Sequence, residues 1–144
     1  MRRAQLVLLA FAVTFLASGC GGHKRLTHAE LVSHMNAVCQ SAIQQVIAIP
    51  APRTSNLDRV GLYIVHLRRV ATYVLNEERR IRPPAADEAL FRKAIGFHVQ
   101  IINTLTRLRA AARRHDRRAV RRGYKLLQGF AHNPYEERLG ISSC

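Results

Sequence analysis

The segment LDRVGLYIVHLRRVATYVLNEERRI, residues 57–81, has the most regular helical pattern in this chain of 144 residues. Its apolar residues recur at alternating steps of three and four positions, which places them along one face of an α-helix. The same spacing is typical of the seam between packed helices. The stripe consists of Leu57, Val60, Ile64, Leu67, Ala71, Val74 and Ile81, interrupted only by Glu78. We therefore expect a long helix that buries this face against other helices.

Capping residues and prolines divide the remaining chain into similar segments. Thr27 and Glu30 have the spacing of a capping box, in which a hydroxyl and a carboxylate satisfy free N–H groups at a helix start. Asn56 or Ser55 can cap the second helix, and Asp116 can cap the fourth. The expected helices cover residues 27–49, 57–81, 85–114 and 116–131, with breaks at Pro50, Pro83 and Pro134 and a last turn at 135–139 that ends at Gly140.

Four amphipathic helices joined by short links predict an all-α fold. The expected arrangement is an antiparallel up-down-up-down four-helix bundle over residues 27–144. Composition favours the same class, because the chain has no tryptophan, only 6% aromatic residues and few strand-like alternations. Its length is typical of one domain with a modest core.

The first 22 residues, MRRAQLVLLAFAVTFLASGCGG, have the three parts of a bacterial lipoprotein signal peptide. Arg2 and Arg3 provide the positive start, a mainly apolar run follows at 6–17, and small residues precede Cys20. The apolar run is shorter than the roughly 20 residues that span a bilayer. We expect residues 1–19 to be a removed signal peptide and residues 20–26 to form a lipidated tether. An ordinary secretory signal is the alternative.

Lipid on Cys20 would fix the location of the protein. In a lipoprotein this thiol carries diacylglycerol, and the new amino group often carries a further acyl chain such as palmitate. Two or more acyl chains anchor a protein stably, whereas one binds reversibly. We therefore expect the cell membrane to be a partner through Cys20, with the helices on its extracytoplasmic face.

Two cysteines remain for structure, Cys39 in the first helix and Cys144 at the end of the sequence. An even pair in an exported chain is typical of a disulfide, and the tail 141–144 would then fold back toward Cys39. The alternative is a buried free thiol at Cys39 and a frayed terminus at Cys144.

Short motifs are spread over nearly the whole chain: Cys20-Gly21-Gly22, Asn36-Ala37-Val38-Cys39, Arg82-Pro83-Pro84-Ala85 and Gly140-Ile141-Ser142-Ser143-Cys144. Their order resembles that of small, uncharacterised predicted lipoproteins from high-GC Gram-positive bacteria, notably soil actinobacteria. The resemblance implies a helical bundle and the pairing of Cys39 with Cys144, and it implies no activity. The last helix is usually uninterrupted in that group, so the break at Asn133-Pro134 is a departure.

The densest charge lies between residues 107 and 125, which hold nine basic residues against one acidic residue, Asp116. Without Arg2 and Arg3, the chain keeps 21 basic and 9 acidic residues, a net charge of +12. In a bundle the cluster surrounds the turn between the third and fourth helices, away from the membrane, where it attracts polyanions. An anionic envelope polymer or an acidic protein is the expected partner rather than nucleic acid, and a merely solvated helix end is the alternative. The candidate anion-binding residues are Arg113, Arg114, Arg117, Arg118, Arg121 and Arg122.

A second basic group, Arg79, Arg80 and Arg82, lies at the end of the second helix. We expect it at the membrane-proximal end together with Lys24 and Arg25. Each cation there would gain about 1 kcal/mol beside an anionic leaflet. Cations at a helix C-terminus are also favoured by the helix dipole.

The sequence contains no recognisable catalytic or metal-binding motif, so we expect no enzymatic activity, no cofactor and no metal. His66 and His98 lie beside core stripes and are interpreted as satisfied or peripheral. Glu78 either pairs with a basic residue across the bundle or lies at a frayed, solvated helix end, and the second interpretation is favoured. The first function hypothesis is a binding or structural role at the cell envelope. The alternative is a bundle that binds a small apolar or metal ligand in its core, near His66, Glu78 or His98.

Overall fold

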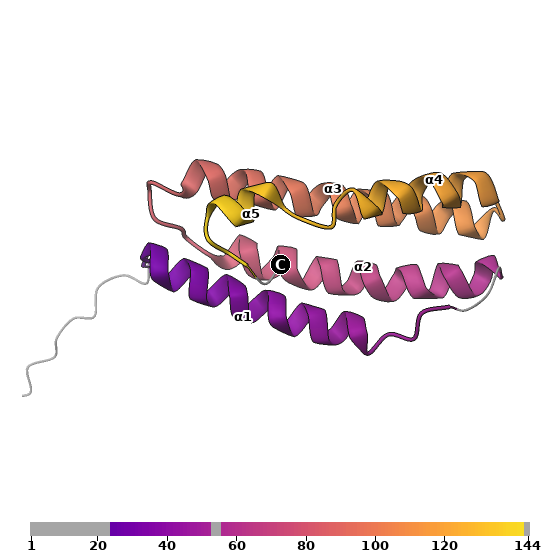
Figure 1. Ribbon diagram of the computed structural model, residues 1–144, viewed down its shortest axis with the longest axis horizontal. Coiled ribbons are helices and arrows are strands. Elements are labelled where there is room, and N and C mark those ends of the chain that lie inside the picture. Colours follow the sequence, from indigo (N-terminus) through magenta and orange to yellow (C-terminus); the bar gives the residue numbers. More distant parts are fainter. Residues whose placement is uncertain (1–23, 53–55, 143–144) are drawn as a thin grey trace, which may run out of the picture.

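The computed structural model describes residues 24–52 and 56–142, which form five helices and no strand. The all-α class predicted from the sequence is confirmed. Figure 1 shows the four longer helices side by side along the long axis. The expected signal peptide at 1–19, Cys20 and Cys144 lie outside the described residues. The helices are α1 (His28–Ile47), α2 (Leu57–Arg80), α3 (Glu88–Arg113), α4 (Arg117–Gln128) and α5 (Pro134–Arg138).

Helix starts have the side-chain caps that the sequence predicts. At α1, Glu30 N–H donates to Thr27 Oγ1 (3.2 Å) and Thr27 N–H donates to Glu30 Oε2 (2.7 Å), which completes a capping box. At α2, Asn56 Oδ1 accepts from two backbone N–H groups. At α4, Asp116 Oδ1 accepts from Ala119 N–H (2.9 Å). Each such cap stabilises its helix by about 1 kcal/mol.

The fourth helix is shorter than expected, because α4 ends at Gln128 and does not continue to Ala131. The cause lies a few residues further on. Pro134 disfavours a helical conformation in the residue before it, and Asn133 caps a new helix instead, accepting from Tyr135 N–H (3.1 Å). The chain therefore turns after α4 and begins α5 as a separate short helix.

The end of α5 is a Schellman motif. Gly140 N–H donates to the carbonyl of Glu137, and Ile141 N–H donates to the carbonyl of Glu136 (both 2.9 Å). Gly140 has φ +77°, a left-handed conformation that glycine adopts without steric cost. The predicted helix end at Gly140 is confirmed, and the motif aims the tail back at α1.

The bundle is built as successive pairs, with α1 packed on α2, α2 on α3, and α3 on both α4 and α5. No described residue of α4 is buried, and α4 covers only the half of α3 that leads to the α3–α4 turn (Figure 1). α5 and the tail cover the other half. The core cluster at that end contains Leu31, Met35 and Cys39 of α1, Phe91 of α3, and Leu139 and Ile141 of the C-terminal segment.

The tail returns to the first helix as expected. Ser142 N–H donates to Asn36 Oδ1 (3.0 Å), and Ile141 packs in the same cluster as Cys39, which is 2% exposed. Asn36 lies about one helical turn before Cys39. The described chain therefore ends beside Cys39, and the pairing of Cys39 with Cys144 remains a prediction. No helix among the described residues is long and apolar enough to cross a membrane.

Candidate functional site

The core contains a cluster of three ionisable side chains from three helices: Glu78 of α2, His98 of α3 and Glu136 of α5. They are 0%, 8% and 1% exposed. Glu78 lies one turn after Val74 on the buried stripe of α2, and His98 lies one turn after Ala94 on α3. One nitrogen or oxygen atom from each side chain lies within 4.8 Å of the other two. We call these residues the buried triad.

Hydrogen bonding within the buried triad is incomplete. His98 Nδ1 donates to Glu78 Oε1 at 2.9 Å. Among the described residues, Glu78 Oε2 and both carboxylate oxygens of Glu136 have no hydrogen-bond partner. The Asn133 side chain donates to the Ala94 carbonyl at 3.5 Å, and it is close enough to Glu136 to lower the pKa of that carboxyl slightly. Buried carboxylates are normally paired, so this cluster stores unfavourable electrostatic energy unless a proton or a cation neutralises it.

The surroundings raise the pKa values of two residues of the buried triad, Glu136 and His98. Burial raises the pKa of Glu136 to about 7, an effect opposed by the charge of His98 and increased by that of Glu78. Burial also disfavours the charged form of His98, but the hydrogen bond and the negative charge of Glu78 outweigh it and raise the pKa of His98. Protons therefore bind this cluster more tightly than they bind the separate side chains.

The buried triad tests several interpretations of the sequence. Placing Glu78 at a frayed, solvated helix end was wrong, because packing of α5 and α3 over the end of α2 removes it from solvent. The alternative, a basic partner across the bundle, is confirmed by His98. His66 is exposed and does not take part. Glu136 was missed, although it precedes the buried Leu139 by three positions and so shares its face of α5.

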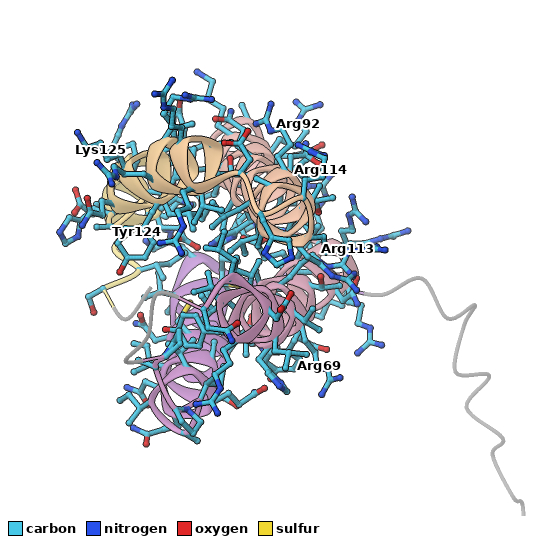
Figure 2. The ribbon with its side chains drawn as sticks, turned by 90° about the vertical axis from the view of Figure 1, so that its right-hand side faces the viewer. Arg69, Arg92, Arg113, Arg114, Tyr124 and Lys125 are labelled. Carbon is cyan, nitrogen blue, oxygen red and sulfur yellow. The ribbon has the colours of Figure 1, made fainter. Side chains whose placement is uncertain are left out.

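The basic residues predicted for anion binding lie together at the α3–α4 turn, in the last turns of α3 and along α4. Figure 2 looks onto this end of the molecule, with Arg113 and Arg114 beside the turn and Lys125 on the outer side of α4. All are exposed except Arg109, which is half-buried. We call this set the cationic end: Arg107, Arg109, Arg113, Arg114, Arg117, Arg118, Arg121, Arg122 and Lys125.

Acidic groups do not neutralise the cationic end. Within residues 24–52 and 56–142, none of its nine cations forms an ion pair. Asp116 is engaged as the N-cap of α4. Asp58 of α2 lies 3.8 Å from His115 Nε2 and does not contact an arginine of the set. The guanidinium groups are thus available to an external anion.

A groove of about 590 Å³ lies beside the cationic end, between α2 and α4. Its apolar walls include Leu57, Ile64 and Leu108, and Arg117 and Arg121 line its edge. The groove exists because the contacts of α4 are mainly with α3. It combines apolar surface with cations, as a site for an amphipathic anion would.

The second basic group lies at the other end of the bundle, as expected. Leu26 N–H donates to the Arg82 carbonyl (2.9 Å), which joins the start of α1 to the link after α2. Arg25 Nη1 donates to the Pro83 carbonyl and to Glu88 Oε2 (both 3.0 Å). Arg80 pairs with Glu77 at 2.7 Å. These cations are partly neutralised, in contrast to the cationic end.

No protein-family model, curated protein or solved structure matches this chain.

Proposed function

We propose that this protein is a lipid-anchored binding protein of the cell envelope whose cationic end binds an anionic polymer. The observation that carries the proposal is the concentration of nine exposed or half-exposed cations, with no ion-pair partner among the described residues, around one turn. Such a surface attracts polyanions over several ångströms and binds them with release of counterions. The alternative partner is an acidic protein, and the experiment below distinguishes it from a polymer.

The position of the cationic end along the molecule supports an envelope polymer over the anchoring membrane. The start of α1 and the α3–α4 turn lie at opposite ends in Figure 1. α3 has 26 residues and is therefore about 39 Å long. A lipid on Cys20 would hold the start of α1 at the membrane. The cationic end would then lie several Debye lengths, each about 8 Å, from the lipid headgroups.

The fold that we propose for this role is an antiparallel up-down-up-down bundle with a Cys39–Cys144 disulfide. Short links at alternating ends support the helix directions, and the return of Ser142 to Asn36 supports the disulfide. In the chain-entropy model, closing a loop of roughly 100 residues stabilises the fold by about 4–5 kcal/mol. No described residue of α4 is buried, so this helix contributes little to the core. A disulfide would supply stability that the packing of α4 does not.

Binding to a linear phosphate polymer tests the proposal. We would titrate the full chain in neutral detergent with poly(glycerol phosphate) and with uncharged dextran, at several salt concentrations. Binding is expected only to the phosphate polymer, and the affinity should fall as salt rises. The triple variant R113Q/R117Q/R121Q should weaken binding at least tenfold. The control R69Q/R92Q/R138Q removes the same charge elsewhere and should have a smaller effect.

The outcomes of this titration discriminate between the hypotheses. Equal losses in the two triple variants would show that total charge, and not the cationic end, governs binding. No binding to the polymer, together with salt-sensitive capture of one acidic envelope protein, would transfer the proposal to a protein partner. No salt-sensitive binding at all would leave the cationic end as a solvated helix terminus.

The groove favours a second candidate function, binding of an anionic amphiphile. An acyl chain would contact Leu57, Ile64 and Leu108, and its headgroup would meet Arg117 and Arg121. Displacement of a fluorescent fatty acid by unlabelled palmitate would test this function, with Leu108→Asn as the variant that makes the groove polar. Failure of the wild-type protein to bind the fluorescent probe would exclude it.

A further inference from the structure

We propose that the buried triad of Glu78, His98 and Glu136 is a binding site for one divalent transition-metal ion, with Zn²⁺ as the probe of choice. The site is independent of the proposed function, because His98 lies 15 residues, or about 22 Å, before the end of α3, and Glu136 lies on α5. One imidazole and two carboxylates form a ligand set typical of zinc, manganese and ferrous iron.

The spacing of the three side chains suits a single ion. Ligand atoms around a tetrahedral zinc, at about 2.1 Å from the metal, lie roughly 3.4 Å apart. The atoms that the buried triad offers lie within 4.8 Å of one another. Small side-chain rotations would therefore bring one atom of each residue into the coordination shell. The ligands come from three helices, so the backbone around them is already fixed by packing.

Unsatisfied oxygen atoms are the independent observation that points to a ligand. Glu136 is 1% exposed, and both of its carboxylate oxygens lack a hydrogen-bond partner among the described residues. Glu78 is fully buried and has one such oxygen. Protons on His98 and Glu136 are one way to neutralise the cluster. A divalent ion also neutralises two carboxylates beside a neutral imidazole, and it coordinates an oxygen of each.

A pocket lies against Glu78, the one member of the buried triad among its lining residues. It has a volume of about 390 Å³, and its lining includes Glu78, Phe91 and Ile95. Water in this pocket would supply a fourth ligand and leave the metal with three protein ligands and one exchangeable position. Arg79 and Arg92 also line the pocket, so a free cation should load slowly and an anion should be tolerated as the fourth ligand.

Zinc binding to the full chain tests the proposal. We would remove metal with a chelator, add Zn²⁺ and measure stoichiometry by competition with a chromophoric chelator. One Zn²⁺ per chain is expected. Glu136→Gln keeps the shape of the side chain, removes one anionic ligand and should weaken binding at least tenfold. Glu137→Gln changes the exposed neighbour on the same short helix and should bind Zn²⁺ as the wild type does.

Two further readouts keep the test decisive. The thermal midpoint of the wild type and of Glu137→Gln should rise with Zn²⁺, whereas that of Glu136→Gln should not move. Co²⁺ should give visible absorption bands of a four- or five-coordinate site in the wild type and none in Glu136→Gln. Absence of stoichiometric binding by the wild type would show that protons alone neutralise the cluster. Retention of binding by folded Glu136→Gln would place the metal elsewhere and would also overturn the proposal.

Discussion

In the metal-free protein, Glu136→Gln is expected to stabilise the fold at alkaline pH and to have little effect at acidic pH. The pKa of Glu136 is about 7 in the folded state, against an ordinary value of 4.5. The folded state therefore binds more protons than the unfolded state between these values, and stability falls as pH rises through this range. At 1.36 kcal/mol for each pKa unit, the wild type loses about 3 kcal/mol between pH 4.5 and pH 8.

His98 acts in the same direction. Its raised pKa means that the folded state favours the imidazolium, so its contribution to stability is present below pH 6.5 and is lost as pH rises through the folded-state value. Glu136→Gln removes the Glu136 part and leaves a smaller slope from His98. The glutamine is uncharged at every pH, so its buried side chain has no ionisation penalty at pH 8.

The assay is urea unfolding followed by circular dichroism at pH 5, 6, 7 and 8, with EDTA present. The free energy of unfolding of Glu136→Gln should exceed that of the wild type by less than about 1 kcal/mol at pH 5 and by about 3 kcal/mol at pH 8, or roughly 10 °C in Tm. Glu137→Gln, whose side chain is exposed, should follow the wild type throughout. A difference between wild type and Glu136→Gln that stays constant from pH 5 to pH 8 would refute the reasoning.

Other features of the fold lead to further predictions. Gly140→Ala should destabilise the protein by about 1–2 kcal/mol because φ is +77°, whereas Gly96→Ala, inside α3 with open space around its Cα, should stabilise it by about 0.5–1 kcal/mol in the same urea assay. Cys144→Ser, and reduction of the wild type, should each lower the free energy of unfolding by up to about 4–5 kcal/mol, and reduction should not affect the variant further. Asp116→Ala should cost about 1 kcal/mol through the lost cap of α4 and should also tighten binding to poly(glycerol phosphate) in a titration, because it removes an acid from the cationic end.

Local signals explain why the helices were largely predictable. The capping box of Thr27 and Glu30 and the cap at Asn56 need only three or four consecutive residues, and both occur as the sequence indicates. The stripe on α2 identified a buried face because helical periodicity is a property of one segment. The cationic end could also be predicted from the sequence, because its residues are close in sequence and the helical hairpin of α3 and α4 keeps them close in space.

The buried triad was not predictable by the same means. Glu78 and His98 are 20 positions apart, and Glu136 lies a further 38 positions along, so no local pattern relates them. A polar residue near a helix end is more often solvated, and only the position of α5 makes Glu78 a core residue. That position depends on the early end of α4 at Gln128, which in turn depends on Asn133 and Pro134. The break between α4 and α5 is therefore what creates the site.

The two proposed binding sites lie on different parts of the bundle, and hydrogen exchange should separate them. α4 has no buried residue and carries like charges, so its amides should open at lower free energy than those of α2 and α3. A polyanion at the cationic end removes that repulsion and should slow exchange in α4 without affecting α5. Zn²⁺ joins α5 to α2 and α3 through Glu136 and should slow exchange in α5 without affecting α4. Protection of both segments by either ligand would mean that the bundle responds as one unit, and that the two sites are energetically coupled through α3.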